Sequence, residues 1–149
     1  MKRRKFIKNS FLATMIPTIG GLLYSGPKTN RKNQPFNLLY APHFGMFSKH
    51  SGSDLVDQIK FMYDMGFLSL EDNGMKDRSV SDQNRIAKTM NKLGMTMGVF
   101  VAHKIYWDFP NLTSGDKNYR DQFIKDIKDS IDVAKRVNAK WMTVVPGHV

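Results

Sequence analysis

Ionisable and strongly polar side chains recur at four points of the sequence, each directly after a run of apolar residues. They are His43 in "YAPHF", Glu71, Asp72 and Asn73 in "SLEDNG", His103 in "VAHK" and His148 in "PGHV". Imidazoles and carboxylates can move protons, hydrogen-bond a polar substrate or hold a divalent metal ion. The histidine spacings match no compact metal-ligand motif, so substrate contact is the expected chemistry. No catalytic residue and no metal ligand is assigned, and plain solvation of the strand ends is the alternative.

The elements that position these residues follow one repeated pattern, in which an amphipathic helix ends at Gly or Asn and a short apolar strand follows. The pattern occurs in "FMYDMGFLSLEDNG", "TMNKLGMTMGVFVAH" and "VAKRVNAKWMTVVPGH". Gly66, Gly94 and Asn138 stand where a left-handed helix cap is needed, because these residue types tolerate positive φ. With a first strand in "FNLLYAPHF", the pattern predicts strands near residues 36–42, 67–71, 95–102 and 141–145.

Between the predicted strands, apolar residues recur at helical spacing, with Ser53 and Ser81 as expected first caps. The stripes are Leu55, Ile59 and Met62; Ile86, Met90 and Leu93; and Phe123, Ile127, Ile131 and Ala134. Apolar strands that alternate with such helices indicate an α/β fold with a parallel sheet. Four β/α units are the N-terminal half of a (β/α)₈ TIM barrel, whose strand ends gather on one rim. The alternative is a small doubly wound sheet, but no glycine-rich phosphate loop supports nucleotide binding.

The formal charge of +10 is concentrated at the N-terminus. The first 34 residues hold eight Lys or Arg and no acidic residue, which leaves 15 basic and 13 acidic residues from Pro35 onward. A nearly balanced domain argues against a nucleic-acid partner. The absence of Cys excludes disulfides and thiolate metal sites.

The N-terminal segment has the pattern of an export signal. A basic cluster precedes an apolar run over residues 11–23, which is too short for a confident membrane span. Arg3, Arg4, Phe6, Ile7 and Lys8 resemble the twin-arginine motif, and a generic basic leader is the alternative. We therefore expect a signal and linker over residues 1–34 and a domain over 35–149. The protein is expected to be exported to the periplasm, with no stable membrane span after signal removal and a membrane anchor if the signal is not cleaved.

The segment after His103, "KIYWDFPNLTSGDKNYRD", is long for a β/α connection. Its Tyr106, Trp107 and Phe109 can close over a small substrate as a lid. An aromatic cluster that anchors the loop on its own domain is the alternative.

Four stretches carry a family resemblance: "NLLYAPHFGMF", "FLSLEDNGM", "LGMTMGVFVAH" and "AKRVNAKWMTVVPG". They resemble hydroxypyruvate isomerase-like proteins of the xylose-isomerase-like TIM-barrel superfamily of sugar isomerases and epimerases, over about residues 35–147. The resemblance implies a divalent metal such as Mg²⁺ or Mn²⁺ that polarises the carbonyl of a small hydroxy-carbonyl or sugar substrate. Paired carboxylates then transfer a proton between adjacent carbons through an enediol-like intermediate.

In the family, the metal ligands and proton-transfer carboxylates come from strands five to eight, and this sequence holds none of those positions. The resemblance therefore assigns only substrate contacts, at His43, Glu71, Asn73 and the region of His103; His148 departs from the family pattern. Three hypotheses follow. The chain is an incomplete and by itself inactive copy of an exported isomerase, a half barrel that completes itself as a homodimer, or a non-catalytic binding module. An endonuclease of the same superfamily is disfavoured by the near-neutral domain charge.

Overall fold

The computed structural model describes residues 32–148, so the predicted export signal and most of its linker lie outside the described residues. The elements in chain order are α1 (Ser48–Ser51), α2 (Leu55–Asp64), β1 (Ser69–Leu70), η1 (Met75–Asp77), α3 (Val80–Leu93), β2 (Thr96–Met97), η2 (Leu112–Ser114) and α4 (Lys117–Val137). The two η elements are short 3₁₀ helices. Within residues 32–148, no helix is long and apolar enough to cross a membrane.

The three long helices begin at carboxylate or hydroxyl N-caps. Both predicted N-caps, Ser53 and Ser81, were wrong. Helix α2 begins after Asp54, whose carboxylate accepts hydrogen bonds from two backbone N–H groups, and not after Ser53. Helix α3 begins after Ser79, two residues before Ser81, because the Ser79 hydroxyl accepts from the backbone N–H of Asp82 at 3.0 Å. The Asp82 carboxylate also accepts from the same hydroxyl at 2.9 Å, so two hydrogen bonds join Ser79 to Asp82.

The predicted left-handed residues at the helix C-termini are confirmed. Gly66, Gly94 and Asn138 have φ values of 103°, 67° and 55°. Gly66 meets a second requirement, since a Cβ atom there would lie 2.5 Å from the backbone oxygen of Gln34. The chain therefore passes from α2 to β1 in direct contact with the segment that enters the domain.

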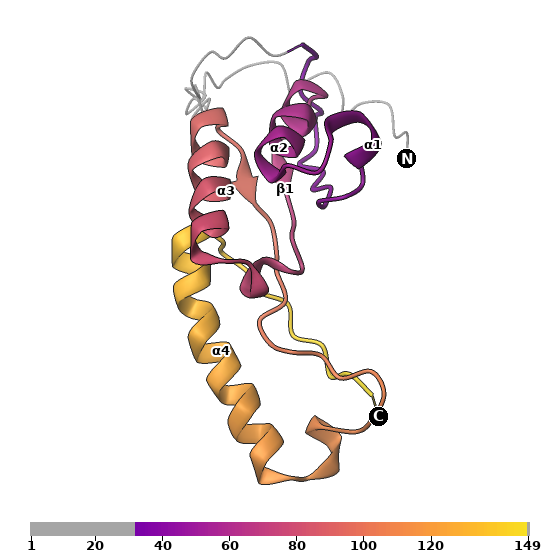
Figure 1. Ribbon diagram of the computed structural model, residues 1–149, viewed down its shortest axis with the longest axis vertical. Coiled ribbons are helices and arrows are strands. Elements are labelled where there is room, and N and C mark those ends of the chain that lie inside the picture. Colours follow the sequence, from indigo (N-terminus) through magenta and orange to yellow (C-terminus); the bar gives the residue numbers. More distant parts are fainter. Residues whose placement is uncertain (1–31, 149) are drawn as a thin grey trace, which may run out of the picture.

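The strand pairing is parallel throughout the described chain. Strand β1 pairs with β2, and parallel bridges join His43 to Glu71 on one side and Val101 to Thr143 on the other. The four chain segments thus lie side by side in the order of the sequence, and Figure 1 shows them along one flank with α3 and α4 along the other. This is a mixed α/β arrangement; half of a TIM barrel remains a prediction.

The regular strands are much shorter than predicted. Residues 36–42 form no strand, and the side chains of Leu38 and Leu39 are 63% and 64% exposed. Residues 141–145 contribute only the bridge at Thr143. These two segments are the outer members of the set, and each has a described neighbour on one side only, so its ladder hydrogen bonds are few.

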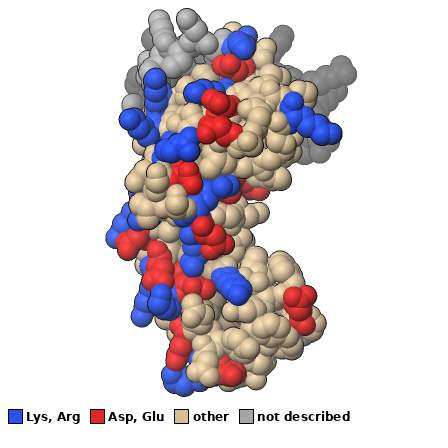
Figure 2. Space-filling view, viewed as in Figure 1, with Lys and Arg blue, Asp and Glu red and all other residues tan. Residues whose placement is uncertain are grey.

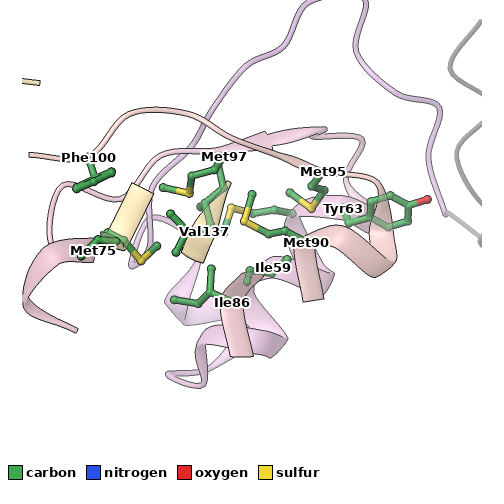
Figure 3. Close-up of a cluster of buried hydrophobic side chains, with 12 residues drawn as sticks. Ile59, Tyr63, Met75, Ile86, Met90, Met95, Met97, Phe100 and Val137 are labelled. Atoms are coloured by element: carbon green, nitrogen blue, oxygen red, sulfur yellow. The ribbon is translucent and has the colours of Figure 1, made fainter. Parts of the chain in front are cut away.

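The core lies between the strands and the helices and is rich in methionine (Figure 3). Helix α3 packs against both α2 and α4. The predicted stripe residues Ile59, Met62, Ile86 and Met90 are buried in this cluster. Met75 of η1, Met97 of β2 and Met95 just before β2 join them, because flexible thioether side chains fill irregular space. The third predicted stripe was wrong in part, because Ile131 is 44% exposed and α4 buries Val133 and Val137 instead.

Candidate functional site

His43 and Glu71 form the centre of the candidate site. They are partners in a parallel bridge, and the backbone N–H of Glu71 donates to the oxygen of Pro42 at 3.2 Å. Bridge partners project from the same side of a sheet, whereas successive residues of a strand alternate. Leu70 is fully buried against the helices, so Glu71 and His43 project from the opposite side. The pattern of the sequence thus correctly placed these two residues together.

Small residues leave space around Glu71. A Cβ atom on Gly98 would lie 3.4 Å from the Cβ of Glu71 and 3.7 Å from that of Ala41. Among residues 32–148, the Glu71 carboxylate has no hydrogen-bond or ion-pair partner. The carboxylate is therefore free to accept hydrogen bonds from a ligand.

The imidazole of His43 is exposed and has a defined free nitrogen. Its Nδ1 lies 3.0 Å from the backbone oxygen of Phe44, and because a carbonyl oxygen only accepts, Nδ1 donates. Within the described chain, this bond leaves Nε2 available to a ligand.

An open pocket of about 240 Å³ lies beside His43 and is lined by His43, Phe44, Asp72, Asn73, Gly74 and Arg78, whereas Glu71 is not one of its lining residues. Asp72 is held in the pocket wall by hydrogen bonds. Its carboxylate accepts from the Arg78 guanidinium at 2.5 and 3.2 Å and from the Gly74 N–H at 3.2 Å. The Arg78 guanidinium also lies over the Phe44 ring, 4.8 Å from its centroid. These contacts hold the turn that presents Asn73 to solvent.

His103 lies away from this pocket and is only 5% exposed. Its Nδ1 donates to the Lys104 oxygen at 2.9 Å, and its Nε2 accepts from the backbone N–H of Val145 at 3.0 Å. The ring also packs edge-on against Phe123. Both nitrogens are thus engaged, and the bond at Nε2 joins the ends of the third and fourth segments. Substrate contact by His103 stays a prediction that requires one of these bonds to break.

The loop after His103 is anchored through its aromatic residues. Tyr106 and Phe109 pack on each other and on Tyr119 of α4, with ring centroids 5.1 to 6.0 Å apart. A parallel bridge joins Pro110 to His148, which is exposed and outside the pocket. These contacts favour the anchoring alternative over a lid, and Trp107 is the aromatic side chain that remains largely exposed.

Sequence reasoning missed Asp126, which joins three elements near the site. Its carboxylate accepts from Lys76 Nζ and the Lys104 N–H at 3.2 Å each, and from Gln122 at 3.1 Å. Burial alone raises the pKa of Asp126, but these hydrogen bonds and the Lys76 charge outweigh burial and lower the pKa below its ordinary value. The available signal was an aspartate three residues after Phe123, on the inward face of α4.

The residues that the structure describes do not assemble a metal site. Within residues 32–148, no three His, Asp or Glu side chains are close enough to hold an ion. The divalent metal implied by the resemblance is therefore assigned no ligands and no step here.

Figure 2 shows basic and acidic side chains interleaved over the flank formed by α3 and α4, where pairs such as Lys125 with Asp129 form.

Comparison with protein-family models, curated proteins and solved structures finds no significant match to this chain.

Proposed function

We propose that this chain supplies the substrate-orienting rim of an exported sugar or hydroxy-carbonyl isomerase, most like hydroxypyruvate isomerase. In this proposal, the residues at the strand ends bind a small hydroxy-carbonyl compound without converting it. The observation that supports the proposal is the His43–Glu71 bridge, which presents on one side of the sheet an imidazole and a carboxylate that has no partner among residues 32–148.

The polar groups at the rim suit such a ligand. A hydroxy-carbonyl compound carries hydroxyl donors and carbonyl acceptors on adjacent carbons. The Glu71 carboxylate accepts from the hydroxyls, His43 Nε2 exchanges a hydrogen bond with an adjacent oxygen, and the Asn73 amide both donates and accepts. The Arg78–Asp72 pair closes the side of the pocket and keeps Asn73 in place.

Binding without turnover follows from the chemistry of the step. Moving a proton between adjacent carbons needs a base on the substrate and a cation at the developing oxyanion. The described rim brings together one free carboxylate and one imidazole, and the Arg78 cation is already bidentate to Asp72. The chain therefore orients the substrate and leaves the proton transfer to groups outside the described residues.

Titration calorimetry with hydroxypyruvate and simple ketoses tests the proposal. We expect binding to the unmodified chain, and Glu71→Gln or His43→Ala to weaken it about tenfold or more, because Glu71→Gln replaces a charged carboxylate acceptor with a neutral amide and His43→Ala removes the imidazole. His50→Ala is the matched control, since His50 is also an exposed imidazole but lies in a separate groove with Phe47 and Phe61. Affinities that are equal in all three variants, or isomerisation of the ligand by the chain alone, would rule the proposal out.

A self-completing dimer is the second candidate, and exposed apolar residues at both edges of the four-segment set favour it. Leu38 and Leu39 lie at one edge, and Trp141, 73% exposed, lies at the other. Pairing one edge with the other edge of a second copy removes both from water. We expect twice the monomer mass in sedimentation and a monomer for Leu39→Asp, whereas Val80→Asp at an exposed position of α3 keeps the dimer. A monomeric unmodified chain would eliminate this candidate.

A further inference from the structure

A second concave site lies at the opposite end of the domain from the loop after His103. The proposed function does not use this site. It is an open groove of about 390 Å³ lined by Phe36, Phe47, His50, Phe61, Met65 and Phe67. We name it the aromatic groove. Its rings pack in a continuous series, with centroids 4.9 Å apart for Phe36 and Phe67 and 5.6 to 5.9 Å for the other contacts.

The groove leaves apolar surface in contact with water. Phe36 and Met65 are 45% and 43% exposed, and the one polar side chain, His50, stacks its ring flat on Phe61. A contiguous apolar hollow of this kind marks a docking site, because covering it removes apolar area from water. No charged side chain lines the groove, so its occupant must itself be apolar.

The chain enters the domain at the rim of this groove. The backbone N–H of Asn33 donates to the Asp64 oxygen at 3.1 Å, and Lys32 pairs with the Asp64 carboxylate at 3.6 Å. The side-chain amide of Asn33 also contacts Met65 Sδ at 3.7 Å. The N–H of Phe36, a wall residue, donates to the Gly66 oxygen at 3.1 Å. The part of the chain before residue 32 is therefore attached to the domain beside the groove.

We propose that the apolar segment over residues 11–23 of the same chain docks in the aromatic groove. This segment is "FLATMIPTIGGLL", which has no charged residue. Residues 24–31 connect this segment to Lys32 and Asn33, which contact Asp64. Eight residues can span roughly 26 Å when extended. Helix α2, which supplies Phe61, is ten residues and therefore roughly 15 Å long, so the connection can reach the whole groove.

The connection over residues 24–31 favours this occupant over a second copy or a free apolar ligand. A connection of eight residues gives the segment an effective concentration in the millimolar range at the groove, far above that of another chain in dilute solution. Docking covers the groove and the apolar segment together. The docked segment is also withheld from any export receptor or bilayer until it leaves the groove.

Disulfide trapping in the full chain tests the proposal, because the native sequence has no Cys. One cysteine replaces Leu12, Ile16, Ile19 or Leu22, and the other replaces His50 at the groove rim. The matched control pairs each segment cysteine with Asp129→Cys, an exposed position of α4. Under mild oxidation at low protein concentration, we expect at least one His50→Cys pair to close within the chain about tenfold or more faster than its control.

Two further results decide the occupant. Met65→Lys places a charge in the groove and is expected to slow the trapping about tenfold, whereas Met46→Lys, at a comparably exposed position outside the groove, leaves the rate unchanged. Equal rates for the His50 and Asp129 pairs would overturn the proposal. Disulfides that form only between chains would overturn it as well and assign the groove to a second copy.

Discussion

Replacing Asp126 with Asn is expected to lower the free energy of unfolding by about 2–4 kcal/mol. The Asp126 side chain is 9% exposed and its partner Lys76 is 20% exposed, so the substitution leaves a largely buried ammonium group without its counter-charge. The carboxylate also accepts from the Lys104 N–H, which fixes the start of the long loop on α4. Urea denaturation followed by circular dichroism measures the change.

Asp129→Asn is the matched control for this prediction. Asp129 lies three residues later on α4, pairs with Lys125 at 2.6 Å and is 52% exposed. An exposed ion pair contributes little, so we expect a change within about 0.5 kcal/mol. Equal losses for the two variants would contradict a special role for Asp126.

The Asp126 contribution should also depend on pH in one direction. Because the folded state lowers the pKa of Asp126 from its ordinary value of 3.8, its stabilisation is fully present above that value and is lost as the pH falls through the lower folded pKa. The stability difference between the unmodified chain and Asp126→Asn should therefore be constant near neutral pH and shrink below about pH 3.8. A difference that grows on acidification would show that the sign of the shift is wrong.

Replacing Phe100 with Ala is expected to have the largest effect on stability, about 3–5 kcal/mol. Phe100 is fully buried in the methionine-rich core, and its backbone oxygen accepts from the Thr143 N–H at 2.8 Å where the third and fourth segments meet. The truncation leaves a cavity that the surrounding side chains fill only in part. Thermal and urea unfolding measure the loss.

Trp107→Ala is the control for the aromatic truncation. Trp107 is 64% exposed in the loop after His103, so its removal should change the free energy of unfolding by no more than about 0.5 kcal/mol. Phe100→Leu should fall between the two, because it retains most of the buried volume. A Phe100→Ala chain as stable as Trp107→Ala would mean that this core is not formed in solution.

Local sequence patterns were sufficient to predict the three long helices and the residues that end them, but not the whole buried face of α4, where Ile131 is 44% exposed. The helical spacing of apolar residues predicted the buried faces of α2 and α3, and the residue types at Gly94 and Asn138 predicted left-handed caps. These features depend on neighbours within about one helical turn. The association of His43 with Glu71 was also predicted, because the ends of adjacent parallel strands lie at the same edge.

Only the tertiary structure decided which polar side chains are free. His103 is engaged by the backbone of Val145, 42 residues later, and Asp126 by Lys76, 50 residues earlier. Glu71, by contrast, has no partner among the described residues. Sequence spacing cannot distinguish these cases, because a side chain's hydrogen-bond partners come from whichever segments folding brings beside it, and those partners determine whether it can contact a ligand.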